Sequence, residues 1–192
     1  MRIVARSIIP LFILCAGCAM EQPSTTADQQ PSSVAIDLLS DVTDVEGKLV
    51  GLAREMNQRQ YAWRPGTGVR SVGEVFLHVA ADNYVLPAML GTAAPAGTGV
   101  TADYQTAVAF EQRTLPRDSV IAELERSFAH LKSALTGVTH GRMADSVAFF
   151  GSQASVQKVW VATTTHLHEH LGQSIAYARS NGVVPPWSRG GN

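Results

Sequence analysis

Cysteine is almost absent from this sequence, which narrows the chemistry that the chain can perform. The chain has 192 residues and two cysteines, Cys15 and Cys18, and both lie close to the N-terminus. The sequence therefore predicts a folded domain without a disulfide, even in a compartment that would permit one. It also predicts a domain without a cysteine nucleophile, so any thiol in its chemistry must come from a second substrate.

An excess of charge of either sign is also missing. Fifteen basic residues stand against 16 acidic ones, and the formal net charge is −1. Because no basic face stands out, nucleic acid is excluded as an expected partner. No internal repeat of solenoid length is visible. Apolar residues make up 45% of the chain, which is enough for one hydrophobic core in a single domain.

The N-terminus has no apolar run long enough to span a bilayer, which takes about 20 residues. Arg2 and Arg6 precede a shorter apolar stretch over residues 7–17. This order of charge and apolar residues is typical of a signal peptide. The sequence that ends at Cys18 is similar to a bacterial lipobox, in which lipid is added to the cysteine and cleavage precedes it. One position departs from that pattern, because Cys15 stands where leucine is expected.

These features predict a lipoprotein that is exported to the periplasm or cell envelope and anchored to a membrane through lipid on Cys18. Ordinary secretion after cleavage near Ala19 is the alternative, and a retained membrane anchor is a third reading. Residues 21–33 are rich in Gln, Ser, Thr and Pro and have little apolar surface to bury. We therefore expect a signal peptide over residues 1–17, a flexible tether over 18–33 and a folded domain over 34–192.

Four segments of the expected domain carry apolar residues at spacings of four and three, which is typical of amphipathic helices. These segments are residues 34–60, a segment from residue 71 to the loop at 91–99, residues 116–137 and residues 154–180. Ser71 and Glu74 have the spacing of a capping box at a helix start. A short helix is expected within residues 104–113, whereas residues 139–152 are expected to be irregular, with Phe149 and Phe150 packed against the helices. No strand is predicted, so the fold class is an all-α four-helix bundle.

Three histidines are the strongest candidates for chemistry. His166 and His170 are four residues apart, so both rings project from one face of their helix, at a spacing that suits metal chelation. His168 points to the opposite side and is expected to be solvated. His78 lies on the second predicted helix, and three imidazoles would leave a coordination position open for water or substrate. The alternative is that these histidines are structural side chains bonded to neighbours.

Several polar residues are candidates for supporting roles. Glu74 and Asp82 each lie one helical turn from His78 and could orient its ring, although a helix cap and a surface charge are the alternatives. Arg70 could bind a substrate anion or pair with Glu74. Asn83 and Gln173 are candidate polar groups near the pocket.

Several further segments form a recognisable pattern together with the three histidines. They are residues 63–65, residues 69–74 leading to His78, residues 166–173, residues 177–179, Gly182 and residues 185–188. With these segments the sequence resembles the DinB-like superfamily of metal enzymes over about residues 36–188. This resemblance implies a four-helix bundle with an up-down-down-up path. It also implies a metal triad that maps onto His78, His166 and His170.

The resemblance leaves three classes of function open. The first is a metal-dependent enzyme acting on a small molecule, either a transferase that uses a thiol such as bacillithiol, mycothiol or glutathione, or a hydrolase. The second is a non-catalytic metal-binding or stress-related module, and the third is an interaction protein. An exported location would argue against a cytosolic thiol as cosubstrate. The expected cofactor is one divalent ion, with zinc, nickel or iron all suited to imidazole. A homodimer is left open.

Overall fold

The computed structural model describes residues 26–190 and is mostly helical. The predicted signal peptide, Cys18 and the first part of the predicted tether lie outside the described residues. Among residues 26–190, no helix has the length and apolar character needed to cross a membrane. The long helices are α1 (Ser33–Glu55), α3 (Val72–Met89), α5 (Arg117–Thr136) and α6 (Val156–Ser180).

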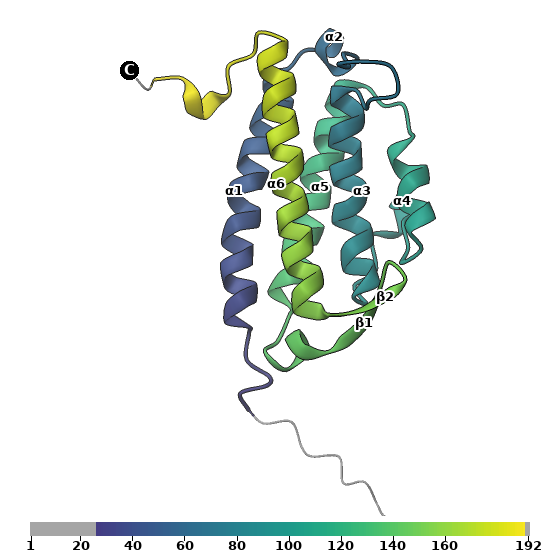
Figure 1. Cartoon of the computed structure of the whole chain (residues 1–192), viewed down its shortest axis with the longest axis vertical. Helices are drawn as coiled ribbons and strands as arrows, with labels where there is room; N and C mark the ends of the chain where they lie inside the picture. The colour runs from purple at the N-terminus through teal and green to yellow at the C-terminus, as the bar shows by residue number, and fades with distance from the viewer. Residues whose placement is uncertain (1–25, 191–192) are drawn as a thin grey trace, which may run out of the picture.

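The four long helices lie side by side around a common core (Figure 1). Helix α3 contacts α5 and α6, and α1 contacts the same two helices on its own side. Helices α1 and α6 run in one direction, while α3 and α5 run in the other. Large side chains from three of these helices fill the space between them, with Phe76, Tyr84, Phe128 and Trp160 each no more than 2% exposed.

Helix α3 is buried along almost its whole length, and this determines where the candidate site lies. The short helix α4 (Tyr104–Glu111) packs on α3 and covers a side that α5 and α6 leave open. Ala107 and Phe110 of α4 are buried. Side chains of α3 therefore face three different helices, and a polar residue on α3 can meet partners from both α4 and α6.

The predicted ends of several helices are confirmed. Ser71 caps α3, and its side chain accepts from the Glu74 N–H while the Glu74 side chain accepts from the Ser71 N–H. Helix α5 begins directly after Pro116 and is capped at its end by Gly137. Helix α6 stops at Asn181 and Gly182, where Gly182 has a φ of +73° that glycine adopts without strain.

The predicted first helix over residues 34–60 is wrong in one respect, because the structure divides it. Helix α1 ends at Glu55, and a separate short helix, α2 (Gln58–Tyr61), follows. Asn57 caps α2 in a reciprocal pair with Gln60. This second capping box starts a new helix in a new direction and provides the turn toward α3.

The prediction that residues 139–152 are irregular and that the chain has no strand is also wrong. Strands β1 (Ser146–Phe149) and β2 (Ser152–Ser155) form an antiparallel hairpin. The turn consists of Phe150 and Gly151, which both have positive φ. Each strand has only four residues, and Val147, Ala148 and Phe149 follow one another in β1, so the sequence lacks the longer polar–apolar alternation that would have revealed the strands. Phe149 packs against the core, whereas Phe150 is 58% exposed.

The structure also differs from the predicted tether at its C-terminal end. Backbone N–H groups join residues 28–32 to the segment after α5, with Ser32 N donating to Val138 O at 3.1 Å and His140 N donating to Gln30 O at 2.8 Å. Ser32 is 1% exposed and caps α1 by accepting from Ala35 N. These hydrogen bonds place residues 28–33 within the folded domain, which therefore begins before residue 34.

Candidate metal centre

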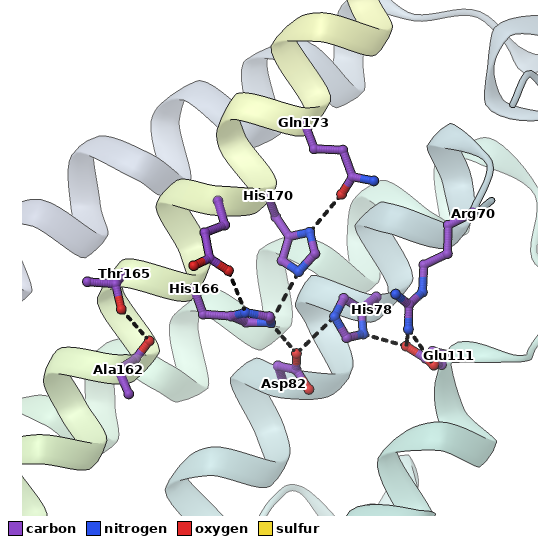
Figure 2. Close-up of polar contacts among 10 residues, drawn as sticks. Arg70, His78, Asp82, Glu111, Ala162, Thr165, His166, His170 and Gln173 are labelled. Carbon is purple, nitrogen blue, oxygen red and sulfur yellow. Dashed lines mark hydrogen bonds and ion pairs between the residues drawn. The ribbon is translucent and has the colours of Figure 1, made fainter. Parts of the chain in front are cut away.

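Three histidine rings converge between α3 and α6 (Figure 2). His78 projects from α3, while His166 and His170 project from successive turns of α6. Each ring contributes one nitrogen atom to a group of three, and these three nitrogen atoms lie within 4.8 Å of one another. His166 Nε2 and His170 Nε2 are 3.1 Å apart. This is the convergence that the four-residue spacing and the placement of His78 predict.

Hydrogen bonds fix which nitrogen of two of these rings faces the others. His78 Nδ1 lies 2.5 Å from Glu111 Oε2, and His170 Nδ1 lies 2.8 Å from Gln173 Oε1. Both oxygen atoms are acceptors, so each Nδ1 carries the proton and each Nε2 presents a lone pair. Gln173 is itself held by Tyr177, whose hydroxyl accepts from its amide at 3.1 Å. The two Nε2 atoms are therefore available as ligands.

Glu111 is the partner of His78 that the sequence analysis missed. It comes from α4, and Arg70 holds its other face through contacts of 3.0 and 3.2 Å to its two oxygens. Burial opposes ionisation of Glu111, but the hydrogen bonds from His78 and Arg70 outweigh it and lower its pKa. The carboxylate is therefore charged and orients the His78 ring, as acidic partners of metal-binding histidines commonly do.

Asp82 lies on the ligand side of the cluster. Its Oδ2 is 2.7 Å from His166 Nε2 and 3.2 Å from His78 Nε2, and the residue is 5% exposed. The sequence analysis expected Asp82 to orient His78 from behind, but the carboxylate faces the nitrogen that would face the ion. The predicted proximity of Asp82 to His78 is thus observed, with a different geometry.

The electrostatics of the cluster leave His170 neutral. Burial lowers the pKa of His170 to about 4, with a smaller effect from the neighbouring histidines. The hydrogen bond to Asp82 raises the pKa of His166 above its usual value, against the opposing effect of burial. Asp82 thus lies beside the ring nitrogens that face one another, in addition to Glu111 behind His78, and a cation held by the three rings would sit close to the Asp82 carboxyl group.

The donor set fits a divalent cation. Nitrogen ligands lie about 2.0–2.1 Å from zinc, so two ligands of a tetrahedral ion are roughly 3.3 Å apart. The 3.1 Å separation of the His166 and His170 nitrogen atoms is close to that value. Imidazole nitrogen with a nearby carboxylate also suits nickel and iron. The residues present therefore match the cofactor that the sequence predicts.

The other predicted residues lie away from the three rings. Glu74 is occupied by the cap of α3 and by Arg64 at 2.8 Å, which matches its structural alternative. Arg70 pairs with Glu111 and not with Glu74. Asn83 faces α5 and donates to Ser127 at 3.0 Å. His168 is exposed on the far side of α6, as its position in the helix predicts.

One side of the histidine cluster opens into a cavity. This cavity has a volume of about 250 Å³, and His166 and Asp82 form part of its wall. The rest of the wall comes from α3, α4, α6 and the hairpin, through Leu86, Tyr104, Phe149, Phe150, Ala162 and Thr163. A molecule in this cavity would contact His166 and Asp82 directly.

Comparison with known proteins identifies relatives of the fold. The sequence profile of the DinB superfamily matches residues 42–174. A DinB-like protein of Bacillus cereus has a similar structure, with a TM-score of 0.64, 17% identity, and coverage of 78% of this chain and 93% of that one. A DinB-like protein of Bacillus subtilis has a TM-score of 0.56 at 15% identity, with coverage of 77% and 93%. These two likenesses show a shared fold. No curated protein matches the chain in sequence.

Proposed function

The chain belongs to the DinB superfamily, and we propose that it is a metal-dependent enzyme that binds one divalent ion through His78, His166 and His170 and acts on a small molecule. The convergence of three imidazole nitrogens within 4.8 Å carries this proposal. The opposed directions of the long helices also support an up-down-down-up four-helix bundle as the topology. Zinc, nickel and iron are the candidate ions.

An enzyme is favoured over a non-catalytic metal-binding module because the site is open. Three protein ligands leave a coordination position for an outside group, whereas a structural site is closed by four. The 250 Å³ cavity reaches His166 and Asp82, so a small molecule has space beside that position. A closed, buried cluster would instead have favoured storage or a purely structural role.

The chemistry follows from what the chain places around the ion. A bound divalent ion would lower the pKa of a water or thiol ligand and so supply a nucleophile near neutral pH. Glu111 and Gln173 hold the rings of His78 and His170 with their Nε2 atoms directed inward. Asp82 is placed to accept a proton from an acidic group that approaches His166. Hydrolysis and thiol transfer both use these elements.

The test combines metal analysis with a substrate screen. The purified protein should hold about one equivalent of a divalent ion, with an affinity that falls as the pH drops through the imidazole range near 6.5. It should turn over at least one member of a panel of esters, amides and thiol acceptors. The His170→Ala variant should lose both properties. If the protein binds metal but turns over no substrate, the enzyme proposal is wrong and a non-catalytic metal-binding module is the remaining function. If it binds no metal, the remaining function is that of an interaction protein.

We also propose that the protein is exported and anchored through lipid on Cys18, on the strength of the N-terminal sequence. Intact mass of membrane-extracted protein should show a lipidated cysteine at position 18 and the loss of residues 1–17. A product that begins after Cys18 and stays in the soluble fraction would contradict the anchor and leave simple secretion.

A further inference from the structure

The cavity beside the histidines has an almost wholly apolar wall. Apart from Asp82 and His166, its polar side chains are Tyr104 and Thr163. The Thr163 hydroxyl is already used, because it donates to Val159 O at 2.9 Å. Burial, aided by the charges of Asp82 and Glu111, raises the pKa of Tyr104, so this side chain stays neutral. The wall therefore offers mostly apolar contact, and the Tyr104 hydroxyl is an uncharged polar group within it.

Aromatic rings dominate the outer part of this wall. The ring of Phe150 packs edge to face against Tyr104, with centroids 5.2 Å apart, and against Phe149 at 4.7 Å. Two of these rings come from the hairpin and one from α4. Such a group of rings presents both faces and edges, which is the surface that a planar apolar group binds best.

The position of Phe150 is not explained by the stability of the hairpin. Phe150 has a φ of 44° and Gly151 a φ of 80°, so both turn residues adopt a left-handed conformation. Two-residue turns of this kind prefer Asn followed by Gly, and a bulky side chain at the first position is disfavoured. The ring contacts Tyr104 and Phe149 but stays 58% exposed, so burial offsets only part of this cost. An unfavourable turn residue whose ring stays largely exposed beside a cavity points to a role in binding.

Away from the ion, the cavity wall provides no positive group for an anionic substituent. No lysine or arginine of residues 26–190 lines it, and Asp82 contributes a carboxyl group at its inner end. The volume also sets a limit, since an apolar cavity of about 150 Å³ accepts benzene and drug-sized ligands need about 300 Å³ or more. A cavity of 250 Å³ thus matches one ring with a short substituent.

A second, larger cavity on the other side of Glu111 does not compete for this role. It has a volume of about 480 Å³ and contains Arg64, Arg70 and Arg113, but none of the three histidines lines it. Each of these arginines is paired with a glutamate of the same chain. A molecule bound there would not touch the metal ligands.

We propose that the cavity is the substrate pocket of the metal site, that it takes a small uncharged molecule with one aromatic or comparably sized apolar group, and that Phe150 forms its selective wall. The proposal rests on the proposed function, because it places the polar end of the molecule at the ion. It deepens that function by assigning a substrate class and a residue that determines specificity.

The test uses two ligands that share a metal-binding group and differ in their apolar part. Benzohydroxamate carries a phenyl ring where acetohydroxamate carries a methyl group. Binding to the Co²⁺-loaded protein is followed through the visible spectrum of the ion. The wild type should bind benzohydroxamate at least about tenfold more tightly, since burial of the ring adds apolar contact. Equal affinities would overturn the proposal.

The decisive variant is Phe150→Asn, because asparagine suits the turn and removes the ring. We expect an unchanged or higher melting temperature, together with a preference for benzohydroxamate that is reduced about three- to tenfold. The affinity for acetohydroxamate should not change. Val184→Asn, at another exposed apolar residue outside the helices, is the control and should keep the full preference. A variant Phe150→Asn that keeps the preference would also overturn the proposal.

A metal-free arm separates failure of the pocket from failure of the metal site. The metal-free protein is titrated with benzamide and with acetamide while its NMR chemical shifts are recorded. Benzamide should shift resonances of the hairpin and of Tyr104, and acetamide should not. This result would support the pocket even if the protein bound no ion. An absence of hairpin shifts with benzamide would contradict the pocket whatever the outcome with Co²⁺.

Discussion

Glu111 and His78 are 33 residues apart and lie on different helices, yet Glu111 Oε2 and His78 Nδ1 are 2.5 Å apart. The contact depends on α4 packing against α3, which the buried Ala107 and Phe110 maintain. A residue outside the cluster thus controls which nitrogen of His78 faces His166 and His170 and would be presented to an ion (Figure 2). The geometry of the site therefore depends on a short helix that carries none of the three histidines.

The first prediction concerns this carboxylate. Replacing Glu111 with Gln should lower metal affinity by about 10- to 100-fold, the range found when partners behind metal ligands are altered. Competition with a coloured chelator would measure the change. Glu125→Gln is the matched control, because Glu125 pairs with Arg54 on the surface. Equal affinities of the two variants would show that Glu111 does not support the site.

The second prediction separates the ligands on α6 from their neighbour. His170→Ala should remove most of the bound metal, whereas His168→Ala should keep it, because His168 is exposed on another side of the helix. The wild type and His168→Ala should gain about 2.7 kcal/mol of stability at a metal concentration 100 times the dissociation constant. His170→Ala should gain far less. Metal analysis and thermal unfolding with and without the ion measure both effects, and equal metal content in the two variants would contradict the triad.

The third prediction tests the start of the fold. Ser32→Ala should destabilise the protein by about 1 kcal/mol and lower its melting temperature by roughly 2–4 °C, because Ser32 caps α1. Ser33→Ala is the control, since Ser33 is exposed at the first position of the helix. A chain that begins at Val34 would also lose the hydrogen bonds to residues 138–141 and should melt below Ser32→Ala. An unchanged melting temperature for that truncation would mean that the paired segment adds no stability.

The fourth prediction concerns pH and a histidine outside the site. Burial lowers the pKa of His130, whose Nε2 is buried without a hydrogen-bond partner in the described structure. The unfolded chain therefore accepts a proton more readily than the folded one. The contribution of neutral His130 to the free energy of unfolding is therefore fully present above the pKa of histidine in the unfolded chain, about 6.5. This contribution is lost as the pH falls below that value.

Replacing His130 with Gln should remove that dependence. The free energy of unfolding of the wild type, relative to His130→Gln, should fall between about pH 7 and pH 5, which denaturant titrations at several pH values would show. The comparison with the variant cancels the contributions of the other histidines. A constant difference across this range would show that the burial of His130 does not affect its protonation.

The sequence predicted those helices whose apolar spacing or capping residues lie within the helix itself or at its ends. The apolar spacing of α3, α5 and α6 identified these helices, and Ser71 with Glu74 marked the start of α3. His166 and His170 were recognisable because one helix fixes their separation. His78 needed the further assumption that its helix lies next to the other two ligands, and the resemblance to a known family supplied it.

The features that the sequence did not predict depend on contacts between distant segments. Nothing near Glu111 in the sequence indicates that it faces His78, since the contact exists only after α4 has packed on α3. The direction of Asp82 was misjudged for the same reason, because one helical turn allows contact with either nitrogen of His78. The hairpin escaped detection because its strands have only four residues each and show no regular alternation of polar and apolar residues.

The placement of Phe150 has a consequence for divergence among relatives. Two long helices hold the three histidines in place. The outer wall of the cavity, in contrast, includes residues from two four-residue strands and the turn that joins them. A substitution in the turn leaves the packing of α3 against α6 untouched. Under the proposed role of the cavity, mutation in the turn would alter which molecules this chain accepts while the frame that holds the histidines is inherited unchanged.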